Sequence, residues 1–141
     1  NKLFPMGVDA IEESIQLIRD DKAPKIIQNI SDGSYESWFG KEQSKIEWSM
    51  DVKDIHALIR ASDPQPGAWS TIKGIEVKLY ESRILSREDT DPGRVYGLDD
   101  CLLIGTKNGI LSFNKIRAGG SKTKALDYCK DNNIHIGDYF N

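Results

Sequence analysis

The sequence contains few of the residues that build metal centres and disulfide frameworks. Its 141 residues include two cysteines, Cys101 and Cys129, and two histidines, His56 and His135. Structural zinc sites need four closely spaced Cys or His ligands, so these scattered residues predict no metal site. We expect both thiols to be buried and reduced, which indicates the cytoplasm or an organelle matrix.

Long apolar runs and an excess of positive charge are also missing. No run approaches the roughly 18 apolar residues of a membrane-spanning helix, and no signal peptide is recognisable, so we expect no membrane partner. Lysine and arginine total 19 residues and aspartate and glutamate 22, for a formal net charge of −3. This balance argues against nucleic-acid binding through the overall charge of the chain.

What the sequence does contain is a helix-to-strand junction near residue 65. A helix that begins near residue 51 must stop around Ser62, because Pro64 cannot continue a helix and disfavours helical backbone at Asp63. Pro66-Gly67 is a turn pair, since proline fixes φ and glycine accepts a positive φ. Ala68-Trp69 then begins an extended run.

The residues around this turn are predicted to hold the domain together. Trp69 stands at the start of a strand, and we expect its ring to fill the core between the helix and the sheet. The alternative is an exposed ring that stacks on a base. Arg60 is predicted to pair with a carboxylate such as that of Asp63. The predicted structural junction consists of Arg60, Pro66, Gly67 and Trp69.

A separate helix is predicted over residues 8–20, where apolar residues recur with helical periodicity. Pro5 and Gly7 precede this helix, and Pro24 prevents its continuation. A lone amphipathic helix of this length is marginal in water, so its apolar stripe needs a partner. We expect this segment either to dock on a neighbouring molecule, as in self-association of the chain, or to be mobile. The stripe consists of Val8, Ile11, Ile15 and Ile18.

Most of the remaining sequence alternates apolar and polar residues, as β-strands do. A possible short strand at 26–30 precedes a polar stretch that we interpret as a linker over residues 31–44. The predicted strands cover residues 45–48, 69–72, 75–85, 94–98, 101–105, 110–116 and 134–140, and a helix capped by Ser121 covers 122–131. The expected fold is mainly β with α: a small open Greek-key barrel similar to an oligonucleotide-binding fold, preceded by a helical arm.

Several of these segments resemble the folate-dependent formyltransferases. Ile59-Arg60 followed by Pro66-Gly67-Ala68-Trp69, placed after Lys45-Ile46-Glu47-Trp48, is similar to the opening of the family's C-terminal domain. This family includes methionyl-tRNA formyltransferase, the hydrolase domain of 10-formyltetrahydrofolate dehydrogenase and the sugar N-formyltransferases. The resemblance implies three parts: the last helix and tail of an absent N-terminal catalytic domain at residues 1–30, a linker at 31–44, and the C-terminal barrel at 45–141.

The resemblance also implies that catalysis takes place outside this chain. The family's catalytic Asn, His and Asp and its folate pocket lie in the N-terminal domain, which is therefore an expected partner. The parent enzyme would use 10-formyltetrahydrofolate, whereas this chain would bind no cofactor and contribute no catalytic residue. His56 and His135 match no catalytic position of the family.

A local basic cluster is the remaining candidate for a binding surface. It surrounds Gly119-Gly120, and clustered cations beside the start of a helix suit phosphate. In the tRNA-modifying members of the resembled family the basic face of the barrel holds the acceptor arm, so the resemblance implies tRNA as a possible partner. The alternative is a solvated charged edge. Two functions remain open: the substrate-binding and domain-packing part of a formyl-group enzyme, or a stand-alone nucleic-acid-binding barrel. The cluster consists of Lys115, Arg117, Lys122 and Lys124.

Overall fold

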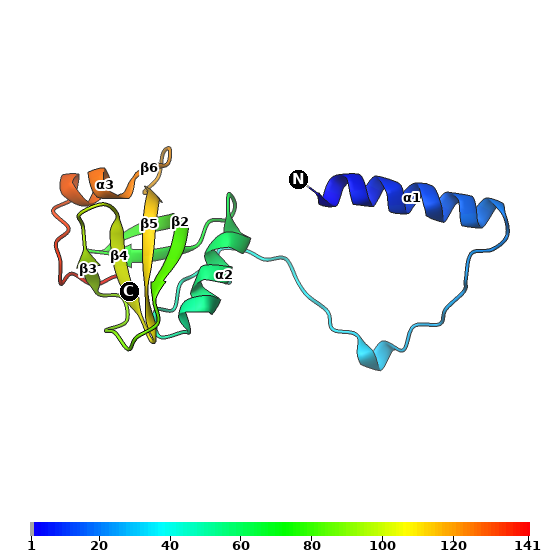
Figure 1. Cartoon of the computed structure of the whole chain (residues 1–141), viewed down its shortest axis with the longest axis horizontal. Helices are drawn as coiled ribbons and strands as arrows, with labels where there is room; N and C mark the ends of the chain where they lie inside the picture. The colour runs from blue at the N-terminus through cyan, green and yellow to red at the C-terminus, as the bar shows by residue number, and fades with distance from the viewer. Residues whose placement is uncertain (1) are drawn as a thin grey trace. The chain divides into compact units, whose positions relative to one another are not determined.

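The computed structural model describes residues 2–141, which form two compact units (Figure 1). The first unit ends at Ser37, and the second covers Trp38–Asn141. Within the described residues, no helix is both long enough and apolar enough to cross a membrane.

The first unit contains a single long helix, α1 (Leu3–Arg19), and a short 3-10 turn, η1 (Ile30–Asp32). The helix begins five residues earlier than predicted because Pro5 lies in its first turn, where the missing N–H has no intrahelical partner to lose. The short strand predicted at 26–30 is wrong, because these exposed residues have no strand pairing. The apolar stripe is on the surface: Val8, Ile11, Ile15 and Ile18 remain 51%, 63%, 51% and 66% exposed.

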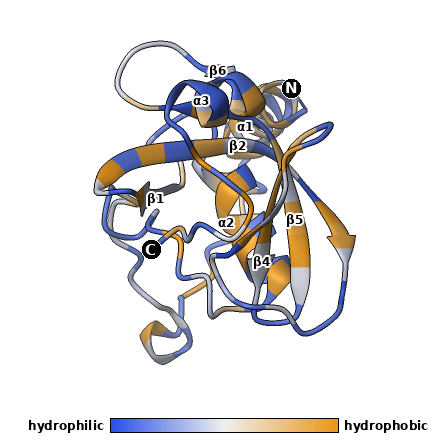
Figure 2. Ribbon diagram, turned by 90° about the vertical axis from the view of Figure 1, so that its left-hand side faces the viewer, coloured by the Kyte–Doolittle hydropathy of each residue, from blue (hydrophilic) through white to orange (hydrophobic). Residues whose placement is uncertain are grey.

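The second unit is built on one six-stranded antiparallel sheet that curls into an open half-barrel. The strand order is β1-β2-β5-β4-β3, and β6 pairs with the far end of β5. Orange and blue bands alternate along β2 in Figure 2, as expected for a strand with one buried face. The strands are β1 (Trp69–Ile72), β2 (Ile75–Ser86), β3 (Val95–Gly97), β4 (Leu102–Thr106), β5 (Gly109–Arg117) and β6 (Thr123–Lys124).

The strand predictions from 69 to 116 are confirmed to within one or two residues at each end. The turn between β1 and β2 uses Lys73 and Gly74, both with positive φ, as a two-residue hairpin of the right twist requires. The turn between β4 and β5 contains Asn108, whose side chain accepts a hydrogen bond from the Val52 backbone N–H. Both hairpins could be predicted from the sequence, because they depend on the residues of the turn itself.

Two helices complete the second unit. Helix α2 (Val52–Ser62) is capped by Asp51, whose carboxylate accepts a hydrogen bond from the Lys53 backbone N–H, and it ends before Pro64 as predicted. It lies against β2 and β5, and buries an apolar face that includes Ile55 and Ile59. The short helix α3 (Ala125–Asp131) packs at the other end of β5 through Ala125 and Cys129.

Three expectations about regular elements are wrong. Residues 45–48 alternate in burial and 134–140 do not, and both segments contribute only isolated bridges, such as Lys45 with Trp69 and Ile72 with Phe140. Helix α3 begins at Ala125 instead of residue 122, because Thr123 and Lys124 pair with β5 and so remain extended. Ser121 therefore caps no helix.

The tryptophan in the core is Trp48, so the prediction that Trp69 fills it is wrong. Trp48 is 5% exposed and meets Phe113 and Phe140 edge-on, with ring centroids 6.1 and 6.0 Å apart. Its indole N–H donates to Ser70 Oγ over 2.9 Å. Trp69 is only half-buried, because Ser70 and not Trp69 takes the inward position at the start of β1.

Candidate binding surface on the sheet

The structure brings the predicted basic residues of β5 and β6 together and adds one that sequence reasoning missed. Lys115 lies directly opposite Lys124 across β5 and β6. Arg117 lies directly opposite Lys78 across β2 and β5. Lys78 was missed because it is 37 residues before Lys115 and reaches the cluster only through strand pairing.

These two cross-strand pairs concentrate positive charge without compensation. Like charges directly opposite each other destabilise a sheet. Among the residues that the structure describes, none of these four cations forms an ion pair with a carboxylate. Lys78 Nζ instead donates to the Pro66 carbonyl oxygen over 2.6 Å. The arrangement is unfavourable for the isolated domain and favourable for binding an anion.

Lys122, the fourth predicted cluster residue, covers an aromatic ring. Its Nζ lies 3.7 Å from the ring centroid of Tyr80, and Arg117 Cζ lies 5.8 Å from the same centroid. Lys122 also pairs with Asp63 over 2.7 Å, which ties the loop after β5 to the end of α2. The predicted pairing of Arg60 with Asp63 is therefore wrong, and Arg60 is exposed.

The Pro66-Gly67 turn lies directly over Tyr80. Gly67 has a φ of +82°, and a Cβ there would stand 2.4 Å from the Tyr80 hydroxyl oxygen. That hydroxyl is buried and has no hydrogen-bond partner within residues 2–141. Glycine is therefore required at position 67 for two reasons: the backbone has a positive φ, and a side chain there would clash with the Tyr80 hydroxyl. The turn, Tyr80 and Lys122 form one packed group beside the Lys78–Arg117 and Lys115–Lys124 pairs.

Trp69 belongs to a second aromatic group on β1. Lys41 Nζ lies 5.1 Å and Lys45 Nζ 5.9 Å from its ring centroid. The indole N–H donates to the Lys41 carbonyl oxygen over 2.7 Å, and Lys41 also pairs with Glu76. The ring therefore links the segment before α2 to the sheet and does not occupy the core.

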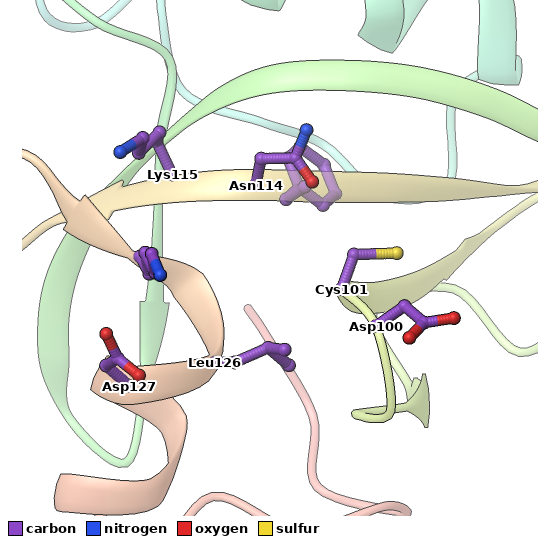
Figure 3. Close-up of a pocket in the computed structure, with 8 residues that line it drawn as sticks. Asp100, Cys101, Asn114, Lys115, Leu126 and Asp127 are labelled. Atoms are coloured by element: carbon purple, nitrogen blue, oxygen red, sulfur yellow. The ribbon is translucent and has the colours of Figure 1, made fainter.

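A cavity of about 390 Å³ opens between β5, the start of β4 and the start of α3. Figure 3 shows Lys115 on one side of it and Asp100 with Cys101 on the other. Lys124 also lines it, so the Lys115–Lys124 pair stands at its edge. The predicted phosphate site at the start of a helix is wrong, because Ser121 and Lys122 lie in the loop before α3.

Within residues 2–141, the histidines and cysteines form no recognisable reactive centre. His56 Nδ1 lies 2.8 Å from the Ser82 hydroxyl, and burial, with a smaller effect of Arg60, lowers the pKa of His56. No carboxylate contacts this imidazole in the described part of the chain, so the pair lacks the third member of a hydrolytic triad. Burial raises the pKa of Cys129 to about 11. No group of three or more His, Cys, Asp or Glu residues within 2–141 is arranged to hold a metal ion.

Comparison with known proteins identifies the family. The family model described as formyl transferase, C-terminal domain, matches residues 39–133. The chain belongs to the formyltransferase family and contains the C-terminal domain of that family. The resemblance to folate-dependent formyltransferases is therefore confirmed. The curled sheet and its two cross-strand pairs of cations are parts of a formyltransferase C-terminal domain.

Relatives from two branches of this family match the chain. Human mitochondrial 10-formyltetrahydrofolate dehydrogenase is 38% identical over 126 residues, covering 88% of this chain and 13% of that protein. Methionyl-tRNA formyltransferase from Alkaliphilus oremlandii is 30% identical over 141 residues, covering 98% of this chain and 46% of that protein. The chain thus spans less than half the length of these curated relatives.

Solved structures of HypX from Aquifex aeolicus share the fold of this chain. A HypX variant superposes with a TM-score of 0.68 at 21% identity, covering 92% of this chain and 24% of that one. HypX in complex with tetrahydrofolic acid superposes with a TM-score of 0.62 at 24% identity, covering 88% of this chain and 22% of that one. At these identities the likeness supports the fold alone.

Proposed function

We propose that this formyltransferase C-terminal domain binds the formyl acceptor for a 10-formyltetrahydrofolate-dependent enzyme of the cytoplasm or an organelle matrix. The catalytic residues and the folate site belong to an N-terminal formyltransferase domain, and this chain contributes neither. Residues 1–30 carry the last helix and tail of that domain, 31–44 are the linker, and 45–141 form a Greek-key barrel similar to an oligonucleotide-binding fold. The family match and both groups of relatives support this assignment.

The two like-charged cross-strand pairs carry the assignment of an RNA acceptor. Lys78 opposite Arg117 and Lys115 opposite Lys124 repel each other within the domain, and RNA phosphates would relieve both repulsions. The chain carries no overall excess of positive charge, with a formal net charge of −3, so the contact is local, and the acceptor most consistent with it is a tRNA. The packed turn of Pro66 and Gly67, with Tyr80 beneath it, gives the cations a rigid base.

The proposal is tested by measuring RNA binding in a double variant in which two lysines are replaced by neutral residues. Lys115→Gln combined with Lys124→Gln removes the repulsion, so the free energy of unfolding should stay the same or rise. The affinity for initiator tRNA, measured by fluorescence anisotropy, should fall at least tenfold. The slope of the logarithm of the association constant against the logarithm of salt concentration should become shallower by about 1 per lost phosphate contact.

The matched control is Lys53→Gln combined with Lys107→Gln. These two exposed lysines lie where the β4–β5 turn meets the start of α2, at the opposite end of the sheet from β6. The control makes the same change in net charge and should leave tRNA affinity within about twofold of wild type, because net charge alone has only a weak effect. Equal losses in both double variants would contradict a localised RNA contact.

A second candidate is a 10-formyltetrahydrofolate hydrolase, in which water is the acceptor. The 38% identity to human mitochondrial 10-formyltetrahydrofolate dehydrogenase favours it. One assay distinguishes the two functions. The chain is joined to its N-terminal domain and incubated with 10-formyltetrahydrofolate, once with aminoacylated initiator tRNA and once without it. Formylated tRNA as the product supports the RNA acceptor. Formate released at the same rate in both reactions supports the hydrolase.

A further inference from the structure

The cavity between β5 and the start of α3 has the size and lining of a small-ligand site. Its volume of about 390 Å³ falls within the range of about 300–1,000 Å³ that is typical of ligand pockets. Among its lining residues, Leu126 is partly exposed and supplies apolar surface, whereas Phe113 is fully buried. Figure 3 shows the Leu126 side chain extending from α3 toward the side of the cavity where Cys101 lies.

The polar side chains around this cavity have no partners among the other side chains that the structure describes. The five are Asp100, Asn114, Lys115, Lys124 and Asp127. Across the described residues, none of them makes a side-chain hydrogen bond or an ion pair, although cations and carboxylates line the same space. Four of the five side chains are exposed and Lys115 is half-buried, so their donors and acceptors are available to a third molecule.

The positions of these groups indicate which chemistry would fit. Lys115 and Lys124 oppose each other across the strands, so a phosphate between them would remove a repulsion. Asp100 lies on the other side of the cavity and accepts hydrogen bonds only, which suits an amino group on a ring. Leu126 lines the cavity and is partly exposed, so a flat apolar ring would contact it.

We propose that this cavity binds one unstacked nucleotide of the RNA, with its phosphate at Lys115 and Lys124 and the amino group of its base at Asp100. The inference rests on the RNA contact proposed above and specifies what one part of that surface recognises. It predicts a preference for adenine, cytosine or guanine over uracil, because uracil carries no exocyclic amino group to donate to the carboxylate.

Cys101 provides a built-in reporter for occupancy. Cys101 lines the cavity and is partly exposed, whereas Cys129, the other cysteine, is 2% exposed with a pKa raised to about 11. Neutral iodoacetamide should therefore alkylate Cys101 first, and mass spectrometry of the peptide gives its rate. With about 5 mM nucleoside monophosphate and a dissociation constant of about 1 mM, mass action should slow alkylation about sixfold.

Five probes and three variants complete the experiment. AMP, CMP and GMP should protect Cys101 more than UMP does, and inorganic phosphate should protect it least. Lys124→Gln should weaken protection by every nucleotide alike. Asp100→Asn should abolish the preference over UMP, and Asp99→Asn, which changes the neighbouring exposed carboxylate outside the cavity, should retain it.

Several results would overturn the nucleotide site. These are no protection by any nucleotide at that concentration, equal protection by inorganic phosphate, or a base preference that survives Asp100→Asn. If tRNA still binds in anisotropy while nucleotides fail to protect Cys101, the nucleotide pocket is wrong and the proposed RNA contact stands. If nucleotides protect Cys101 but tRNA does not bind, the proposed RNA contact is wrong.

Discussion

At the level of single side chains, burial decides which of two tryptophans stabilises the domain. Trp48 contacts Phe113 and Phe140 in the core, whereas Trp69 lies half-buried under two lysines. Trp48→Ala should therefore lower the free energy of unfolding by about 3–5 kcal/mol. Trp69→Ala should lower it by about 1 kcal/mol, as for a partly exposed residue. Urea unfolding of both variants checks this, and equal losses would contradict the assignment of the core.

The close approach of the turn to Tyr80 makes a second prediction at this level. Gly67→Ala adds a Cβ at positive φ that meets the Tyr80 hydroxyl, while Gly74→Ala adds one at a φ of +78° with nothing within 4 Å. Gly74→Ala should cost about 1–2 kcal/mol from backbone strain alone. Gly67→Ala should cost more, because the steric clash is added.

Tyr80→Phe provides the test of that steric cause. Removing the hydroxyl should recover part of the loss in Gly67→Ala, and it also removes a buried oxygen without a partner. A thermodynamic cycle of the two single variants and the double variant measures the coupling. A coupling near zero would mean that the turn shifts away from Tyr80 without cost.

His56 should make stability depend on pH. Burial, then Arg60, lowers its pKa in the folded state, so the unfolded chain binds a proton first as pH falls. The contribution of His56 is fully present above the unfolded pKa of about 6.5 and is lost as pH falls below it. Urea unfolding from pH 8 to 5 should show a smaller decline in His56→Gln than in wild type. His135→Gln, which changes an exposed ring, should behave as wild type.

At the level of elements, α1 is a helix without a core of its own. Every residue of its apolar stripe is at least half exposed, and no residue of the helix is buried. A single amphipathic helix owes most of its stability to packing, so this one should be marginal in the chain alone. We propose that the stripe packs on the N-terminal formyltransferase domain, with self-association of the chain as the alternative.

Hydrogen exchange separates these possibilities for α1. In dilute monomeric chain, amides 8–19 should exchange quickly while those of α2 stay protected, because α2 buries Ile55 and Ile59. Joining the N-terminal domain should protect 8–19. Protection that rises with chain concentration would instead support self-association. Strong protection of 8–19 in a proven monomer would show that α1 packs on its own chain.

At the level of the whole molecule, charge and chemistry are unevenly distributed. The chain carries a net charge of −3, yet its cross-strand cations gather at one part of the sheet. The isolated chain should neither hydrolyse 10-formyltetrahydrofolate nor transfer its formyl group, because its histidine–serine pair lacks an orienting carboxylate. Formate assays and formyl-transfer assays check this. Turnover that disappears in His56→Ala would contradict it.

The sequence by itself determined the features that depend on neighbouring residues. The end of α2 before Pro64, the hairpin turns at Lys73-Gly74 and Asn108, and the central strands follow from local sterics and from alternation. The family followed from motifs such as Pro66-Gly67-Ala68-Trp69. These signals act within a few residues, so they can be interpreted without the fold.

Only the tertiary structure decided which distant residues meet. Lys78 joins Arg117, Lys122 covers Tyr80, and Ser82 reaches His56 through strand pairing and helix packing, which no local pattern encodes. Tertiary pairing also overrode local preference. The extended pairing of β6 with β5 delayed the start of α3, and inward placement of Ser70 kept Trp69 out of the core. Register across strands sets these contacts, because a shift of one residue exchanges the buried and exposed faces.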